Sequence, residues 1–175
     1  MIGPGRHASS RLAPALQVAP NAQLWSVLSR DLDRAEKFAL QHAAASPKPA
    51  YTSLEEMLAD PELHAVLIAS PDKLHADQVV SAAQAGKHCL VEKPMATDTE
   101  SCKRMILAAR ENKICLAIAY HLRWHDGHRI VHEEIRNGKI GPIRHIRTQW
   151  TWKAEDGSNW RASPDVGKWW SLGGV

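Results

Sequence analysis

The feature that most constrains the fold of this chain is the stretch 86–94, with the sequence GKHCLVEKP. Gly86 permits the left-handed backbone that ends many helices, and residues 88–91 form the short, mostly apolar run typical of a buried parallel strand. The acid, base and proline of residues 92–94 then follow at the carboxyl end of that strand, where open α/β sheets bind their ligands. Lys93 is therefore a candidate for proton exchange with a ligand, although most lysines after a strand are plain surface residues.

Predicted strands and helices alternate around this stretch along the first 120 residues. A parallel strand has to be reached by a crossover connection, so this alternation favours an α/β fold with a doubly wound parallel sheet and helices on both faces. Asp31 and Ser53 are expected to cap two of the helices. Cys102, Met105, Ile106 and Ala109 are expected to form the buried face of a third, at 97–112. The predicted strands are 23–28, 51–52, 65–69, 88–91 and 114–119.

Composition excludes several classes of protein. Hydrophobic residues make up 44% of the chain and charged residues 23%, as in ordinary globular proteins. The net charge of +3 is small and scattered, which argues against a nucleic-acid partner. No apolar run approaches the roughly 20 residues that span a bilayer, and no signal segment begins the chain. Three widely spaced cysteines indicate reduced thiols and a cytoplasmic location, with Cys89 and Cys115 expected in the core.

A glycine-rich turn lies at the amino terminus. Gly3, Gly5 and Ala8 form a G-x-G-x-x-A pattern, which permits a tight turn and the close approach of a pyrophosphate to the backbone. Residues 1–2 would be only the tail of the central strand, whose loss would leave its neighbours without hydrogen-bond partners. The helix after the turn is expected to bury a stripe of apolar residues at Leu12, Ala15, Leu16 and Ala19.

Three motifs in this order carry a resemblance to a known family. The glycine-rich turn, the segment Ser70-Pro71-Asp72 with His75, and the turn at 92–94 together resemble the Gfo/Idh/MocA family, over nearly the whole chain. Asp72 stands where that family more often has Asn. The resemblance implies an NAD(P)-dependent oxidoreductase that acts on sugars, cyclitols or similar small molecules and assembles as a homo-oligomer.

The resemblance also implies the domain organisation and the site. Residues 1–120 would form a Rossmann-type dinucleotide-binding domain, and residues 121–175 the beginning of a mainly antiparallel α+β domain for substrate binding and oligomerisation. Both ends would be incomplete, and a fragment of this kind is expected to be inactive. The implied substrate-binding residues are Lys93, Arg123, Trp160 and Arg161. The implied cofactor-binding residues are Gly3, Gly5, Arg6, Ser29, Arg30, Ser70, Pro71, His75, Glu92, Lys93 and Arg123.

The pair Ser29-Arg30 bears on the choice of cofactor. In this fold an acid after the second strand binds the 2′-hydroxyl of the adenosine ribose and favours NAD. A hydroxyl beside a guanidinium suits a 2′-phosphate better, because the guanidinium fork matches phosphate geometry. The sequence therefore favours NADP over NAD, unless Arg30 is merely a solvated loop residue. For His75 the open alternative is a residue at a helix start with no function.

Lys93 is the candidate for the proton step of a hydride transfer between nicotinamide and a secondary alcohol or carbonyl. A free lysine titrates near about 10.4, whereas useful catalytic bases titrate near about 7–8. The positive charge of an oxidised nicotinamide would help to keep Lys93 neutral during alcohol oxidation. Glu92 would favour the charged lysine, so its role is expected to be orientation. Pro94 fixes the turn and permits a cis peptide bond.

Two other classes compete with this reading. One is a nucleotide-binding or regulatory protein without catalysis, because a fold alone never proves chemistry. The other is a metal-dependent enzyme, because His121, His125, His128 and His132 are spaced 4, 3 and 4 apart and would share a face on one helix. Asp126 and Gly127 argue against a continuous helix there, and no metal is expected. A helix at 129–137 and a long strand at 143–153 follow.

Overall fold

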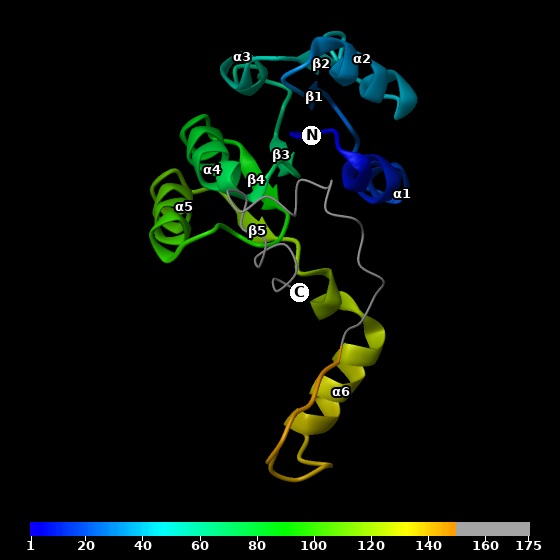
Figure 1. Cartoon of the computed structure of the whole chain (residues 1–175), viewed down its shortest axis with the longest axis vertical. Helices are drawn as coiled ribbons and strands as arrows, with labels where there is room; N and C mark the ends of the chain where they lie inside the picture. Colours follow the sequence, from blue (N-terminus) through cyan, green and yellow to red (C-terminus); the bar gives the residue numbers. More distant parts are fainter. Residues whose placement is uncertain (150–175) are drawn as a thin grey trace, which may run out of the picture.

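The computed structural model describes residues 1–149 and contains a parallel sheet with helices on both faces (Figure 1). Each described strand pair is parallel: β1 with β2, β3 with β4, and β4 with β5. The predicted fold class is confirmed. The strands are β1 (Val27–Leu28), β2 (Ala50–Tyr51), β3 (Ala65–Ile68), β4 (His88–Val91) and β5 (Leu116–Ile118).

Residues 1–3 occupy the central position of the sheet. Ile2 forms parallel bridges with Leu28 on one side and with Ile68 on the other. The backbone N–H of Leu28 donates to the carbonyl of Met1, and that of Ala69 donates to the carbonyl of Ile2, both at 2.8 Å. The strand order is therefore β2–β1–(1–3)–β3–β4–β5. These residues take the position of the central strand, and they supply hydrogen-bond partners to the carboxyl ends of both neighbours.

Side chains that alternate along the strands pack into two separate hydrophobic cores, one on each face of the sheet. Side chains of one parity pack against the first and second helices. Those of the other parity pack against α3 (Leu54–Leu58), α4 (His75–Gln84) and α5 (Thr99–Glu111), as the two-residue period of a strand requires. The first core includes Met1, Val27, Ala50 and the partly buried Leu67. The second includes Ile2, Leu28, Tyr51, Val66, Ile68, Cys89 and Val91.

Side-chain caps set the starts of three helices. The carboxylate of Asp31 accepts from the N–H of Arg34, and the hydroxyl of Ser53 accepts from the N–H of Glu56, so both predicted caps are confirmed. Asp98 caps a third helix in the same way. Gly86 has φ +71° and ends α4 in the left-handed region, as expected. The capped helices are α2 (Leu32–Gln41), α3 (Leu54–Leu58) and α5 (Thr99–Glu111), while α4 (His75–Gln84) follows the short η2 (Asp72–Leu74).

The first helix buries the predicted stripe only in part, because Leu12 and Leu16 pack against the core whereas Ala15 is exposed. It begins as a π-helical turn, η1 (Ala8–Leu12), and continues as α1 (Ala13–Val18). A π-helical turn holds more residues than an α-helical turn, which shifts the inward face along the sequence. Ala8 and Ala13 are therefore buried, whereas Ala15, which the 3.6-residue period placed inside, is exposed.

Two further burial predictions need correction. Ile106 on α5 is 40% exposed, and Ala108 is buried in its place beside Met105. The inward face of α5 is thus rotated toward the Ala108 side. Cys89 is buried as predicted, but Cys115 precedes the start of β5 and is exposed. All three cysteines are free thiols.

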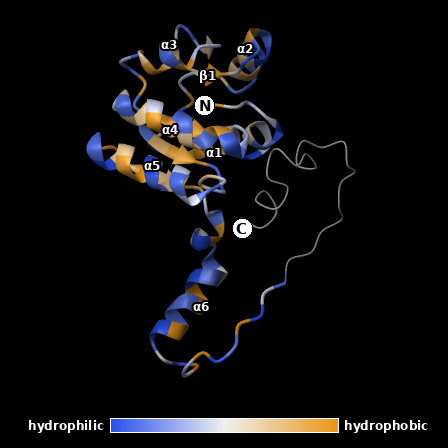
Figure 2. Cartoon of the chain, turned by 60° about the vertical axis from the view of Figure 1, so that its left-hand side comes forward, coloured by the Kyte–Doolittle hydropathy of each residue, from blue (hydrophilic) through white to orange (hydrophobic). Residues whose placement is uncertain are grey.

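The chain leaves the sheet after β5 through η3 (His121–Trp124) and α6 (Asp126–Arg136). Figure 2 shows α6 standing away from the sheet as a mostly hydrophilic helix, and none of its residues is buried. No strand forms over residues 143–149, where a long strand was predicted, because no described segment pairs with them. Residues 150–153 of that strand, with Trp160 and Arg161, lie outside the described residues. None of the helices within residues 1–149 is long and apolar enough to cross a membrane.

Candidate functional site

The predicted site residues converge on one edge of the sheet. Because all described strands run parallel, their carboxyl ends meet at the same edge, where ligands bind in open α/β sheets. Five of the connections that leave from this edge carry predicted site residues. They carry Gly3 and Gly5 after the central segment, Ser29 and Arg30 after β1, Ser70 and Pro71 after β3, Glu92 and Lys93 after β4, and Arg123 after β5.

The glycine-rich turn is shaped by two glycines with different surroundings. Gly3 has φ +85°, and a Cβ built on it would lie 2.7 Å from the backbone nitrogen of Ser70, so no side chain fits there. A Cβ built on Gly5 would meet no atom within 4 Å, so the space beside Gly5 is open. The turn therefore packs against the connection after β3 on one side and leaves room on the other.

His75 joins two of the connections from inside the protein. Its side chain is fully buried, with Nδ1 3.0 Å from the carbonyl oxygen of Pro94 and Nε2 3.0 Å from that of Ser70. A neutral imidazole has one N–H and donates to only one of these carbonyls, whereas an imidazolium donates to both. Both ring nitrogens face backbone oxygens, so the geometry favours a structural role over a direct contact with a ligand. The hydroxyl of Ser70 donates to Oε1 of Gln78 on α4 at 2.6 Å.

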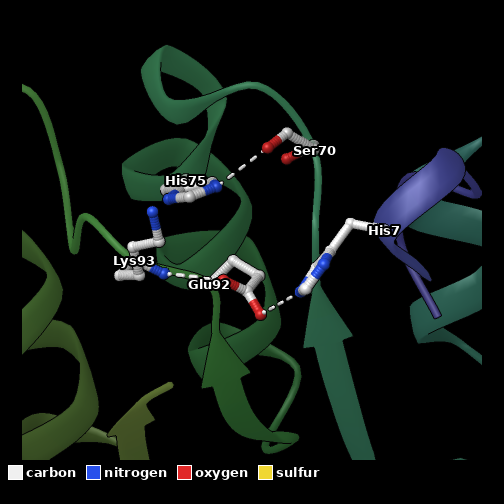
Figure 3. Close-up of polar contacts among 5 residues, drawn as sticks. All are labelled: His7, Ser70, His75, Glu92 and Lys93. Carbon is white, nitrogen blue, oxygen red and sulfur yellow. Dashed lines mark hydrogen bonds and ion pairs between the residues drawn. The ribbon is translucent and has the colours of Figure 1, made fainter. Parts of the chain in front are cut away.

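The connection at 92–94 is anchored at both ends. The N–H of Glu92 donates to the carbonyl of Ile68 at 2.8 Å, and the carbonyl of Pro94 lies against His75. The Lys93–Pro94 peptide bond is cis, as its sequence permitted. In Figure 3 the Lys93 side chain points to the side of the turn on which His75 lies. The backbone of Lys93 is thus held in place by the sheet and by α4.

An unpredicted contact links this connection to the glycine-rich turn. Nε2 of His7 lies 3.1 Å from Oε1 of Glu92, while Oε2 of Glu92 accepts from the backbone N–H of Lys93 at 3.2 Å (Figure 3). His7 and Glu92 are 85 residues apart in the sequence. The sequence placed His7 inside the G-x-G-x-x-A pattern at a position open to any residue, so no signal there pointed to this contact.

Two of the arginines predicted to bind ligands, Arg30 and Arg123, are exposed. Arg30 lies two residues after the end of β1, and its side chain has no hydrogen-bond or ion-pair partner among the described residues. Beside it, the hydroxyl of Ser29 accepts from the N–H of Asp31 at 3.3 Å. Arg123 lies in η3, just beyond the edge of the sheet. Both side chains are therefore available to a ligand from solution.

The histidine series does not share one helix face. His121 lies in η3 and His125 is extended, with ψ 125°, while His128 and His132 belong to α6. The break falls at His125, whereas Asp126 and Gly127, which were expected to interrupt the helix, lie in its first turn. An acid in a first turn is favoured by the helix dipole. Within residues 1–149, no group of three or more potential ligands is arranged to hold a metal ion.

Burial makes the thiol of Cys89, in the core strand β4, unreactive. Desolvation, helped by the nearby Cys115, raises the pKa of the Cys89 thiol to about 12. A thiol must ionise to react, so Cys89 is an inert core residue at neutral pH. Lys93 stays the group that the sequence predicts for proton transfer at this edge.

Known proteins resemble this chain in both sequence and fold. Residues 1–120 match a family model (GFO_IDH_MocA) described as "Oxidoreductase family, NAD-binding Rossmann fold". A scyllo-inositol 2-dehydrogenase (NADP(+)) of Bacillus subtilis is 38% identical over 122 residues, which is 70% of this chain and 36% of that protein. A dTDP-3,4-didehydro-2,6-dideoxy-α-D-glucose 3-reductase of Actinomadura kijaniata is 32% identical over 95% of this chain and 49% of that protein.

The solved structures agree with these sequence matches. A 3-ketoreductase from Actinomadura kijaniata, solved in complex with NADP, superposes with a TM-score of 0.73 at 33% identity, covering 82% of this chain and 44% of that one. The chain thus spans less than half the length of each of these three relatives.

Proposed function

Because this chain belongs to the Gfo/Idh/MocA oxidoreductase family, whose matched domain is an NAD-binding Rossmann fold, we propose that it transfers a hydride between nicotinamide and a secondary alcohol or carbonyl. The substrate class is a sugar, a cyclitol or a similar small molecule. One observation carries the proposal: Lys93 stands at the carboxyl end of β4, on the edge where the cofactor domain binds its ligand. Relatives that act on scyllo-inositol and on a deoxysugar nucleotide support the substrate class.

The glycine-rich turn would hold the pyrophosphate of the cofactor. The open space beside Gly5 leaves room for phosphate oxygens at the backbone, and Gly3 sets the turn that makes this approach possible. The helical segment that starts at the turn directs its N–H groups and positive dipole end to the same place. Arg6, in the turn, would add a positive charge toward the phosphates.

Ser29 and Arg30 would select the cofactor. Both lie after β1, where the fold places the adenosine ribose, and the connection carries a guanidinium where an acid would favour NAD. The unengaged side chain of Arg30 would bind the 2′-phosphate of NADP. The NADP bound to the structural relative is in keeping with this preference.

The nicotinamide end would lie against the connections after β3 and β4. Ser70, Pro71 and Glu92 would line it, and His75 would contribute by holding the two connections together rather than by touching the cofactor. When bound, the cofactor supplies the hydride chemistry. The chain itself positions the reacting groups and moves the proton.

Lys93 would give or take that proton at the substrate oxygen. In the direction of alcohol oxidation a neutral Nζ accepts the hydroxyl proton, and in the direction of carbonyl reduction a protonated Nζ donates it. Arg123, exposed beyond the same edge, would bind the substrate or the cofactor. Trp160 and Arg161 stay proposed substrate contacts, and homo-oligomerisation and a cytoplasmic location stay proposals for the whole protein.

The test separates this function from nucleotide binding without turnover. NADPH and NADH are titrated into the purified protein by following nicotinamide fluorescence. Turnover of NADP⁺ is then assayed with a panel of sugars, cyclitols and nucleotide sugars. Oxidation of at least one of them, lost in Lys93→Met, supports the proposal. The assay uses the protein together with any coding sequence that adjoins it. Tight NADPH binding without turnover of any substrate favours the non-catalytic alternative.

A further inference from the structure

We propose that His7 is a positioning residue for Lys93 and acts through the carboxylate of Glu92. The inference rests on the proposed role of Lys93 and extends it to a residue of the glycine-rich turn. It starts from a side-chain contact that crosses from that turn to the connection after β4, between His7 Nε2 and Glu92 Oε1 at 3.1 Å (Figure 3).

The carboxylate of Glu92 is held from two sides. Its side chain is only 16% exposed, and its other oxygen accepts from the backbone N–H of Lys93 at 3.2 Å. Each oxygen therefore has a nitrogen donor other than the Lys93 ammonium. His7 is 54% exposed, so the donor that fixes Oε1 reaches in from the outer side. Without that donor, the carboxylate loses the side-chain partner of Oε1 and gains freedom to rotate.

Rotation of this carboxylate would change the chemistry of Lys93. A carboxylate beside an amine favours the protonated amine, and the effect grows as the two groups approach. A Glu92 freed from His7 can turn toward the adjacent Lys93 and hold it as an ammonium, which cannot accept a proton. His7 therefore keeps Glu92 in a role of orientation, and it does so from the turn proposed to bind the pyrophosphate.

Three substitutions at one position separate this role from packing. His7→Phe keeps a ring and removes the donor. His7→Gln places an amide N–H about where Nε2 stands, and His7→Asn carries the same amide one carbon shorter, out of reach of Glu92. His64→Ala is the control, because His64 is an exposed histidine beside the amino end of β3, at the opposite edge of the sheet.

The kinetic expectation is a loss in kcat with cofactor binding kept. His7→Phe and His7→Asn should lower kcat for alcohol oxidation on the order of tenfold, since misplaced catalytic groups lose rate steeply. They should also shift the acidic limb of the pH profile of kcat to higher pH, because Lys93 cannot accept a proton while it is protonated. The dissociation constant for NADPH should change less than about twofold, and His7→Gln should recover most of the rate. Equal losses in NADPH affinity and kcat would overturn the inference, because His7 would then bind the cofactor itself.

A second readout needs no turnover. Competitive acylation followed by mass spectrometry reports, for each lysine, the pH at which half of the side chain is labelled. For Lys93 this midpoint should rise by about one pH unit in His7→Phe and His7→Asn. It should not rise in His64→Ala. In a Glu92→Gln background, His7→Phe should leave the midpoint in place, because the carboxylate that transmits the effect is gone.

The two readouts keep this inference distinct from the proposed function. An unchanged midpoint in His7→Phe overturns the positioning role whatever the activity of the protein. A shifted midpoint in a protein that turns over no substrate supports the positioning role and counts against the oxidoreductase proposal alone.

Discussion

The amino group of Met1 should make the stability of this chain depend on pH between 5 and 8. The group is fully buried at the centre of the sheet and donates to the carbonyl of Ser26 at 2.7 Å. Burial lowers its pKa from 8.0 to about 5, because the charged form loses its hydration. The folded chain therefore holds this amine neutral at pH 7, whereas the unfolded chain binds a proton there.

The sign and size follow from linkage. Between pH 5 and pH 8 the unfolded state binds more protons than the folded state, so the free energy of unfolding rises with pH. Each pH unit corresponds to about 1.4 kcal/mol. Relative to its value above pH 8, the free energy of unfolding is lower by about 1.4 kcal/mol at pH 7 and by about 4 kcal/mol at pH 5. Below pH 5 this loss levels off, because the folded chain binds the proton as well.

The assay compares two chains by urea denaturation at several values of pH from about 5 to about 8.5, and the three free thiols are common to both chains, so their ionisation cancels in the difference. The second chain carries four added residues, Met-Val-Ala-Val, before Met1. In that chain the amine lies outside the described fold, and residue 1 offers an amide N–H to the same Ser26 carbonyl. Histidines titrate in both chains alike, so the difference between the two curves isolates the amine. Parallel curves across the whole range would refute the reasoning.

Four further substitutions test the site itself. Arg30→Ala should weaken NADPH binding by about tenfold or more, through the loss of a charge-assisted contact, and leave NADH binding nearly unchanged; equal losses would exclude a 2′-phosphate site. Lys93→Met should lower turnover by about 10²–10⁴-fold with NADPH affinity intact, and a fall of less than a few-fold would make Lys93 structural. Gly3→Ala should lower the free energy of unfolding by about 2 kcal/mol or more, because it forces a side chain to φ +85° against the Ser70 backbone. Gly5→Ala, whose Cβ meets only open space, should change stability by less than about 0.5 kcal/mol yet weaken NADPH binding, and the reverse pattern would contradict the assigned turn.

The sheet and its ligand edge could be predicted because local patterns determine them. Apolar runs at 65–69 and 88–91, each followed by a turn, specified two neighbouring parallel strands and the ends that carry Ser70 and Lys93. Side-chain caps at Asp31 and Ser53 depend on residues only three positions away, so they too were readable. Where the local period changed, the prediction was wrong. The π-helical turn at 8–12 moved the buried position from Ala15 to Ala13.

The contacts that tie the site together could not be predicted, because they join residues far apart in sequence. His7 meets Glu92 across 85 residues, and His75 meets Pro94 across 19. Nothing in the local pattern of either histidine specifies a partner, since an imidazole suits exposed and buried places alike. Their roles become visible only when the parallel strands bring the connections to one edge.

The described edge holds its proposed proton-transfer group and its proposed charge-binding groups in different ways. The backbone of Lys93 lies between two anchors, the Glu92 N–H on Ile68 and the Pro94 carbonyl on His75. Arg30 and Arg123 are exposed on long side chains. Proton transfer depends on placement to within about an ångström, so a mobile Lys93 would lose rate. A guanidinium at the end of a long exposed side chain can reach a phosphate or carboxylate in solution and bind it through its planar fork. This difference is what the hydride-transfer proposal requires of the edge, and a nucleotide-binding protein without catalysis would need only the second kind of residue.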